Sequence, residues 1–325
     1  MKKTHKVKRN EAGMRLDVFL SSKSDDTRSQ IKKRIERGEI LVNKKPAKVH
    51  EFLKEGDEIR PAAKKKGVLA TAAPAPKKRK SPSLKPKIIF EDENFIVLDK
   101  PSGMLVHPTS ANETNTLMDW LIAKYPKIKK VGEEKYRCGI IHRTDRDVSG
   151  ILLAAKTQKA YLHMKNEFKK RRVKKEYLAL VYGNAPDEGK IDLPIGRSKD
   201  GRFVSHPRVK KTFLTKKDKS AITLYQKEKT YEKFSLLRVR ILTGRTHQIR
   251  AHLSAIGHPI VGDDDYGPRK TIFKERTRKI KVIDVPRIFL HAEKIGFANP
   301  DETWSEFSSP MPSAMKKYLR DANAL

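Results

Sequence analysis

Apolar residues in the second part of the chain form runs that are typical of buried strands. The runs cover 95–98, 150–155, 177–182 and 234–242. Between them, apolar residues recur at helical spacing over 116–124, 157–170 and 245–256. Because the strands do not alternate strictly with long helices, the pattern predicts an α+β fold and not a doubly wound sheet.

The first sixty residues carry a shorter pattern, a helix followed by a strand. Residues 27–30 predict a capping box, and Ile31 and Ile35 share one face of the helix that begins there. Gly38 is expected to end this helix, because glycine readily adopts the left-handed backbone of a helix terminus. Residues 40–42 then predict a short strand.

Charge and proline content divide the chain into three parts. Residues 1–61 carry a net charge of +7, and residues 88–325 carry +18. Residues 62–87 hold nine basic residues, no acidic residue and four prolines, so they cannot bury a core. We therefore expect a first domain at 1–61, a basic, flexible linker rich in Pro, Lys and Ala at 62–87, and a second domain at 88–325.

Composition narrows the class of partner and the location. The 325 residues carry a net charge of +34, which predicts a polyanionic partner, above all nucleic acid. No apolar run is long enough to predict a membrane span, and no apolar stretch follows the basic N-terminus as in a signal peptide. Cys138 is the only cysteine, which excludes an intramolecular disulfide and fits the reducing cytoplasm.

Basic residues cluster at three places, and each cluster is either a solvated surface or a set of phosphate contacts. One lies on the predicted helix of the first domain, a second covers 169–175, and a third covers 269–281. We favour phosphate contacts, because few acidic residues balance the charge. The candidate RNA-binding residues are Arg28, Ser29, Lys32, Lys33 and Arg37 in the first domain and Lys170, Arg171, Arg172 and Lys174 in the second.

Familiar nucleotide and metal motifs are missing from the sequence. It contains neither a phosphate-binding loop nor a dinucleotide-binding glycine motif after a strand. His247 and His252 are five residues apart, a spacing that does not bring two zinc ligands to one helical face. Residues 263–265 are three aspartates that could bind a divalent metal, but the flanking glycines favour a turn. We therefore predict no metal site.

Two segments place many polar side chains among apolar neighbours. Residues 142–147 lie between two strand-like runs, where a rigid scaffold can present reactive groups in a loop. Residues 244–253 open a predicted helix in which Ile249 and Leu253 point inward. The pattern by itself leaves two interpretations open for both segments, structural ion pairs and caps or catalytic groups.

The first domain resembles the S4-like RNA-binding domain. The resemblance covers residues 14–61 and implies binding of structured RNA by a small α/β domain. The residues that carry it are Arg15, Leu16 and Asp17, then 27–31, Gly38, 40–43, Gly56 and Asp57.

The second domain resembles the RluA family of RNA pseudouridine synthases, with blocks in the family's order over residues 88–320. His142, Arg143 and Asp145, followed by Ser149 and Gly150, are similar to the block that holds the family's catalytic aspartate. The other matching blocks are 99–108, 174–179, 194–197, 244–253, 257–267 and 290–292. The resemblance implies a largely antiparallel mixed sheet with flanking helices, and with the S4-like domain it is closest to the RluC-like and RluD-like members.

The resemblance also implies roles for single residues. Asp145 would be the catalytic carboxylate, with Asp147 as its rival, and Arg250 would pair with it. Tyr177 would stack on the flipped uracil and help to move a proton, and Arg143 would fill the gap that the base leaves in the RNA stack. The remaining candidate substrate-binding residues are His142, Ile249, Arg245 and His247.

The same resemblance indicates the reaction and the partner. Converting uridine to pseudouridine conserves all atoms, so we expect no cofactor. The sequence leaves open whether the aspartate attacks C1′, attacks C6 or acts as a base. We expect a cytoplasmic monomer that acts on ribosomal RNA of the large subunit. The alternatives are a transfer RNA target and a non-catalytic RNA-binding or ribosome-assembly protein.

This chain departs from the family pattern at two positions of the catalytic block. Thr144 stands where the family usually has leucine, and Val148 stands where it usually has threonine. Neither change removes a titratable group, so we expect rearranged hydrogen bonding in the loop and no loss of the catalytic carboxylate.

Overall fold

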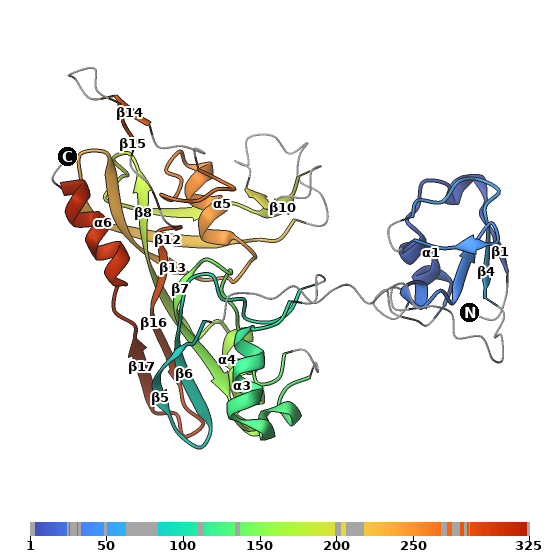
Figure 1. Ribbon diagram of the computed structural model, residues 1–325, viewed down its shortest axis with the longest axis horizontal. Coiled ribbons are helices and arrows are strands. Elements are labelled where there is room, and N and C mark those ends of the chain that lie inside the picture. The colour runs from blue at the N-terminus through green and yellow to red at the C-terminus, as the bar shows by residue number, and fades with distance from the viewer. Residues whose placement is uncertain are drawn as a thin grey trace. The chain divides into compact units, whose positions relative to one another are not determined.

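A computed structural model divides the chain into two compact units, residues 1–77 and 78–325 (Figure 1). Each unit is described by itself. The structure describes residues 4–24, 26, 31, 34–48, 51–62, 84–109, 113–133, 137–198, 203–205, 218–267, 272–274, 280–282, 285 and 287–323. In this part of the chain no helix is long and apolar enough to cross a membrane.

The first unit is a small sheet covered by short helices. Its strands follow the order β1 (His5–Lys6), β4 (Glu58–Pro61), β2 (Ile40–Val42) and β3 (Lys45–Pro46), and its helical elements are η1 (Arg9–Glu11) and α1 (Leu16–Lys23). Ile31 and Ile35 are buried with Leu16 and Phe19, so the predicted helical face does form part of the core. Gly38 has φ +68°, as expected of a residue that ends a helix.

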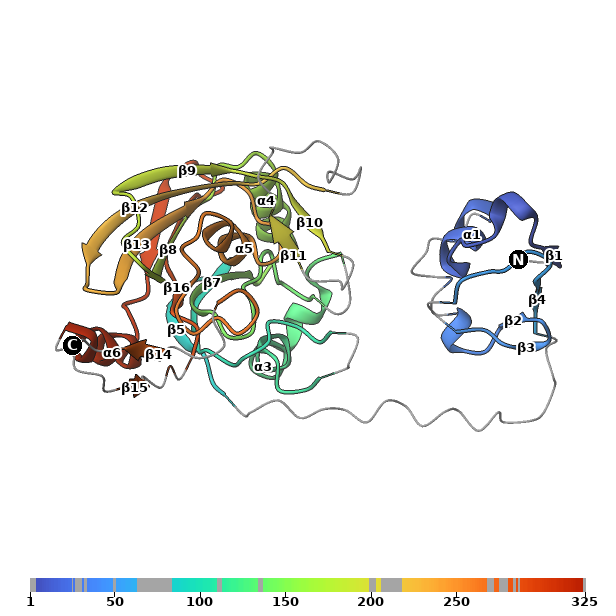
Figure 2. The same ribbon diagram turned by 90° about the horizontal axis from the view of Figure 1, so that it is seen from above.

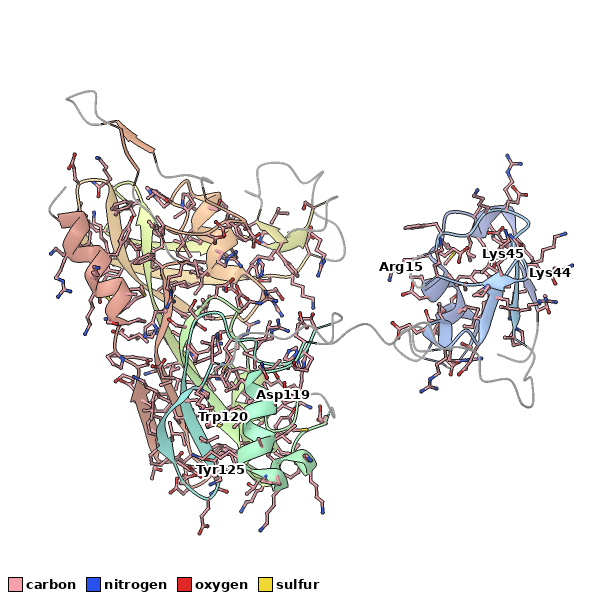
Figure 3. All side chains as sticks on the ribbon, viewed as in Figure 1. Arg15, Lys44, Lys45, Asp119, Trp120 and Tyr125 are labelled. Atoms are coloured by element: carbon pink, nitrogen blue, oxygen red, sulfur yellow. The ribbon has the colours of Figure 1, made fainter. Side chains whose placement is uncertain are left out.

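Part of what the sequence predicts for this unit lies outside the described residues. This holds for the capping box at 27–30 and for the candidate RNA contacts Arg28, Ser29, Lys32 and Lys33. Arg37 is described, and its guanidinium lies 3.7 Å from the Glu39 carboxylate. Figure 3 shows Lys44 and Lys45 at the turn between β2 and β3, where both are exposed.

Residues 63–83 of the expected linker also lie outside the described residues. Its last residues contact the second unit, because Leu84 packs against the core of that unit and Lys87 begins β5. Leu84 and Lys87, which the charge pattern assigns to the linker, are therefore part of the second unit.

The second unit is built on one nine-stranded sheet. Its strands follow the order β5 (Lys87–Glu91), β6 (Phe95–Lys100), β7 (Ser149–Ala155), β16 (Leu290–Ala298), β8 (Lys174–Tyr182), β13 (Phe234–Ile241), β12 (Ile222–Thr230) and β9 (Glu188–Asp192), and β17 (Trp304–Ser308) pairs with β16. The pairing of β16 with β7 is parallel, and all the others are antiparallel. The described elements thus form the mixed, largely antiparallel sheet that was predicted.

Helices and two small hairpins complete the second unit. Its helices are α3 (Leu117–Lys124), η2 (Pro126–Lys130), α4 (Gln158–Lys169), α5 (Gln248–Ala255) and α6 (Ser313–Asn323), and its hairpins are β10 (Ile195–Arg197) with β11 (Phe203–Ser205) and β14 (Ile272–Lys274) with β15 (Ile280–Val282). Figure 2 shows the sheet curving around α5. Thr116 caps α3 and Thr157 caps α4, so a side-chain oxygen accepts a free backbone N–H at each start.

Three strands meet beside the loop that carries the candidate catalytic groups. β7 lies between β6 and β16, and the loop at 141–148 leads directly into it. Gly150 allows this arrangement, because a Cβ atom there would lie 2.1 Å from the carbonyl oxygen of Ala292 on β16. A side chain at this position would push β7 and β16 apart and displace the loop.

Candidate active site

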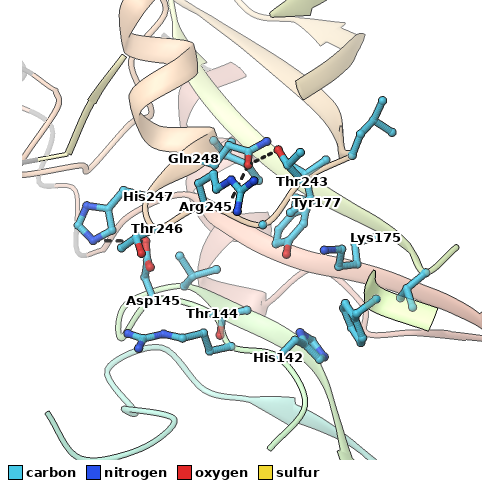
Figure 4. A pocket seen from close by; sticks show the side chains of 18 of the residues that line it. His142, Thr144, Asp145, Lys175, Tyr177, Thr243, Arg245, Thr246, His247 and Gln248 are labelled. Carbon is cyan, nitrogen blue, oxygen red and sulfur yellow. Dashed lines mark hydrogen bonds and ion pairs between the residues drawn. The ribbon is translucent and has the colours of Figure 1, made fainter. Parts of the chain in front are cut away.

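A cavity of about 520 Å³ opens beside this loop (Figure 4). Its walls come from the loop before β7, the end of α4, the strand β8 and the segment that joins β13 to α5. All candidate catalytic and substrate-binding residues line it, namely His142, Arg143, Asp145, Tyr177, Arg245, His247, Ile249 and Arg250. The two polar segments of the sequence therefore meet at one site, and the roles of their residues remain predictions.

Asp145 and Arg250 form the ion pair that the resemblance implies. The Arg250 Nη1 atom donates a hydrogen bond of 3.3 Å to the Asp145 Oδ2 atom, across 105 residues of sequence. The Asp145 side chain is 22% exposed and that of Arg250 is 11% exposed, so substrate can still reach the carboxylate. Asp147 does not line the described cavity, and its side chain is exposed.

Arg250 is itself held by two further carboxylates. Its Nε and Nη2 atoms donate hydrogen bonds of 2.7 Å each to Asp263, whose side chain is fully buried. Nη2 also donates to Asp265 at 2.6 Å, and that side chain is 52% exposed. Burial would lower the pKa of Arg250, but the hydrogen bonds and negative charge of Asp263, with the charge of Asp145, raise the pKa above its ordinary value. The guanidinium therefore stays charged and fixed in plane.

The acidic triplet at 263–265 is a turn, as predicted, and it also serves the site. The Asp263 Oδ1 atom accepts backbone N–H groups from Asp265 at 3.1 Å and from Tyr266 at 3.2 Å. The same carboxylate thus shapes the turn and clamps Arg250, a role that the sequence analysis missed. The described residues contain no group of three or more His, Cys, Asp or Glu side chains that could hold a metal ion.

Tyr177 faces the cavity from the centre of the sheet (Figure 4). It lies on β8 opposite Val239 of β13 and Ala292 of β16, so strands on both sides fix its position. Its burial, followed by the negative charge of Asp145, raises the pKa of the hydroxyl. At neutral pH the group is therefore a protonated hydroxyl that can donate a hydrogen bond.

His142 and Lys175 occupy the part of the cavity next to Phe168. The His142 Nε2 atom accepts the backbone N–H of Leu153 at 3.0 Å, and its ring stacks on Phe168 with centroids 5.1 Å apart. Burial, and then the charge of Lys175, lower the pKa of His142 to about 3, so the ring is neutral. Burial also lowers the pKa of Lys175 to about 8.

The basic residues at 170–174 lie in different surroundings. Arg171 lines the cavity, whereas the Arg172 guanidinium pairs with the buried carboxylate of Glu167. The Lys174 Nζ atom lies 5.0 Å from the centre of the exposed Trp304 ring, away from the cavity. Two lysines that were not among the candidate residues, Lys169 and Lys175, also line the cavity.

His247 begins α5 in a left-handed backbone conformation, with φ 54° and ψ 23°. Its Nδ1 atom lies 3.0 Å from the Tyr266 hydroxyl, which donates to the carbonyl oxygen of Phe203 at 2.7 Å. Because that carbonyl only accepts, the His247 Nδ1–H must donate to the tyrosine oxygen. Nε2 is then directed to Asp145, with 3.8 Å between Nε2 and Oδ2. Strained backbone of this kind is typical of positions that a site requires.

The main chain around Asp145 is anchored from the end of β6 and the residues that follow it. Lys100 is fully buried, and its Nζ atom donates to the carbonyl oxygens of Pro101, Met104 and Arg146 at 2.9–3.1 Å. The Ser102 hydroxyl donates to the carbonyl oxygen of Asp147 at 2.7 Å. Three elements of sequence thus fix the reactive loop: this segment, β7 and α5.

The two departures from the family pattern are both buried. Val148 packs in the hydrophobic core. The Oγ1 atom of Thr144 is buried and has no hydrogen-bond partner among the residues that the structure describes. The rearrangement of loop hydrogen bonds stays a prediction, because the Thr144 hydroxyl makes no described hydrogen bond.

Comparison with known proteins relates this site to an established family. Residues 94–255 match the family of RNA pseudouridylate synthases, and residues 14–59 match the S4 domain. The ribosomal large subunit pseudouridine synthase C of Vibrio parahaemolyticus is 34% identical over 312 residues, which cover 95% of this chain and 92% of that protein. The uncharacterized RNA pseudouridine synthase YlyB of Bacillus subtilis is 32% identical over 310 residues, with 94% and 93% covered.

The two matches define an enzyme that acts on RNA and carries an S4 domain. More specifically, the chain belongs to the RNA pseudouridine synthase family and is an isomerase, so the resemblance seen in its sequence is confirmed. The human RNA Pseudouridylate Synthase Domain Containing 1 is similar in structure, with a TM-score of 0.54 and 24% identity over 74% of this chain and 96% of that chain. This likeness confirms the predicted fold.

Proposed function

We propose that this enzyme isomerises specific uridines of large-subunit ribosomal RNA, with Asp145 as the reacting carboxylate and without a cofactor. The observation that carries the proposal is the contact of Asp145 with Arg250 inside a cavity that Tyr177 also lines. The Vibrio parahaemolyticus relative is named as a ribosomal large subunit pseudouridine synthase, which supports the ribosomal substrate. A protein that only binds RNA would not need Asp145, Arg250 and Tyr177 together. Transfer RNA is the alternative substrate, and the experiment includes it.

The reaction requires little more than a carboxylate and a bound base. The N1–C1′ bond of uridine breaks, the uracil turns within the pocket, C5 bonds to C1′, and the C5 proton is replaced by a proton at N1. The charged Arg250 keeps Asp145 ionised and fixed for this step. In this proposal the hydroxyl of Tyr177 contacts the base and helps to transfer the proton.

A uridine that is stacked in RNA must leave its stack to enter the cavity. Flipping a base costs a few kcal/mol, which contacts in the flipped state have to offset. We propose that Arg143, at the rim of the cavity, fills the vacated stack with its planar guanidinium. We also propose that Lys170, Arg171, Arg172 and Lys174, together with the first unit, contact phosphates, and that the enzyme is a cytoplasmic monomer.

A transcript that carries tritium at C5 of its uridines tests the proposal, because isomerisation releases the label into water. The parent should release tritium from large-subunit ribosomal RNA, in buffer with or without EDTA, and much less from transfer RNA. Asp145→Asn should abolish release while the RNA Kd changes less than twofold. Asp147→Asn is the matched control and should retain most activity. Turnover by Asp145→Asn, or an inactive Asp147→Asn, would show that the wrong carboxylate has been chosen.

A further inference from the structure

The guanidinium of Arg143 is held by a histidine from a distant part of the chain. The Arg143 Nη1 atom lies 2.9 Å from the His107 Nε2 atom, across 36 residues of sequence. His107 is buried, with 6% of its surface exposed, whereas Arg143 is exposed at the rim of the cavity. The buried His107 side chain thus contacts the exposed side chain of Arg143.

The hydrogen bonds determine the protonation state of His107. Its Nδ1 atom lies 3.0 Å from the carbonyl oxygen of Pro108, which can only accept, so Nδ1 carries a proton. A guanidinium can only donate, so Nε2 must accept from Arg143. The neutral ring with its proton on Nδ1 satisfies both contacts, whereas a charged ring would direct an N–H group at the guanidinium.

A neutral acceptor suits an arginine that has to engage RNA. Fixing an arginine side chain costs conformational entropy, and this loss opposes its insertion into a base stack. A carboxylate would also fix the side chain, but it would neutralise the charge, as Glu113 does in part for the neighbouring Arg146 at 3.7 Å. His107 restricts Arg143 and leaves its full positive charge available to the RNA.

The contact also separates Arg143 from the reacting carboxylate. Burial lowers the pKa of Arg143 below its ordinary value, and the negative charge of Asp145 opposes this shift in part. An unrestrained Arg143 could turn toward Asp145 and compete with Arg250 for it. A hydrogen bond to His107 draws the guanidinium toward the 100–108 segment instead.

We propose that His107 is a positioning residue that holds Arg143 at the rim of the cavity, ready to replace the flipped uridine. The proposal rests on the proposed function, because it assigns His107 a part in the same base-flipping step. His107 itself touches neither the base nor the reacting atoms.

Two substitutions of His107 separate its two hydrogen bonds. An asparagine amide can still donate to Pro108 but is too short to reach Arg143, so His107→Asn removes only the contact under test. A glutamine amide reaches farther and offers an oxygen to Arg143, so His107→Gln should restore it. His163→Asn is the matched control. The His163 ring, on α4, donates to the carbonyl oxygen of Ala298 on β16, and His163 does not line the described cavity.

The assay is single-turnover release of tritium from a large-subunit ribosomal RNA transcript with excess enzyme, together with the RNA Kd from filter binding. His107→Asn should lower the rate constant about tenfold and change Kd less than twofold, and His107→Gln should recover most of the rate. Arg143→Met keeps the length of the side chain and removes its donors. In that background His107→Asn should change the rate less than twofold, because His107 acts through Arg143.

Several outcomes would overturn the proposal. These are an unchanged rate in His107→Asn, an equal loss in the parent and Arg143→Met backgrounds, or a His107→Gln variant that is as slow as His107→Asn. If His107→Asn fails to fold in thermal melts, His107→Ala takes its place, and its losses in the parent and Arg143→Met backgrounds decide in the same way. A parent that releases no tritium would refute the proposed function first, and this proposal with it.

Discussion

Asp263 and Asp265 offer a sharp test of how burial determines the strength of an ion pair. Both carboxylates accept a hydrogen bond from the same Nη2 atom of Arg250, at 2.7 and 2.6 Å. The Asp263 side chain is fully buried and that of Asp265 is 52% exposed. Changing each to asparagine removes one negative charge and keeps the volume. The Oδ1 atom that accepts the N–H groups of the turn can be retained in Asp263→Asn.

The expected magnitudes differ several-fold. Removing one partner of a buried ion pair costs about 3–5 kcal/mol, because the other charge is left without compensation. Arg250 keeps Asp145 and Asp265 after Asp263→Asn, so we expect the lower end, about 3 kcal/mol, or roughly 6–12 °C in Tm for a unit of this size. An exposed pair contributes about 0–1 kcal/mol, so Asp265→Asn should lower Tm by at most about 4 °C.

Urea unfolding measures the two free energies, and single-turnover tritium release measures the effect on the site. Asp263→Asn should also slow the reaction, because the plane of Arg250 is no longer fixed and its contact with Asp145 is weakened. Asp265→Asn should leave the rate within about threefold of the parent, since about 0.6 kcal/mol corresponds to that factor. If both variants unfold with the same free energy, burial does not distinguish these two pairs and the reasoning is wrong.

Three further predictions concern the loop, the pocket and the first unit. Thr144→Val should raise the free energy of unfolding by about 1 kcal/mol, because it removes a buried hydroxyl without a described partner. Thr116→Val should lower this free energy by about 1 kcal/mol, because it removes the cap of α3. Shifts of the two variants in the same direction would contradict this. Because burial lowers the pKa of Lys175 to about 8 from 10.5, the folded state releases its proton before the unfolded state does, and stability gains from this group as pH rises between these values. Lys175→Met should therefore raise Tm more at pH 7 than at pH 10, and a gain independent of pH would argue against it. Deleting residues 1–61 should raise the RNA concentration needed for half-maximal rate and flatten the salt dependence of binding, while the saturating rate is retained; a folded but inactive truncated protein would refute this.

The sequence pattern predicted four strands of the sheet and missed others, including β16, which lies at its centre between β7 and β8. The four apolar runs became β6, β7, β8 and β13, because strands buried on both faces are apolar throughout. β12 was not predicted, because its second half is exposed and polar and it lies next to the edge strand β9. α6 was also missed, although Met315, Tyr318 and Leu319 are spaced as on one helical face and are buried. That signal was present in the sequence.

The candidate site could be predicted to the extent that its residues match family blocks. Those blocks bring Asp145 and Arg250 together across 105 residues, which no local pattern could do. Asp263 was interpreted as part of a turn, and it is one. A single sequence carries no signal that the same carboxylate is fully buried against Arg250, because burial depends on the packing of segments that are distant along the chain.

Lys100 illustrates the same limit for a lysine. It stands between Asp99 and Pro101, where a lysine would ordinarily be exposed. Instead it is fully buried, and burial lowers its pKa to about 7. One of its hydrogen bonds reaches the carbonyl oxygen of Arg146, 46 residues away. The need for a hydrogen-bond donor at position 100 follows from the tertiary structure, and the neighbouring residues do not indicate it.

The position of Asp145 is determined by groups on two sides of it. On the main-chain side, Lys100 and the backbone N–H of Gly103 both donate to the carbonyl oxygen of the next residue, Arg146. On the side-chain side, Arg250 donates to the carboxylate and is itself clamped by Asp263. Because neither set of contacts depends on substrate, the carboxylate is oriented without RNA, as the reacting group that we propose should be. Substitution of Lys100 or Asp263 should therefore slow isomerisation, although both side chains are too deeply buried to touch the uridine.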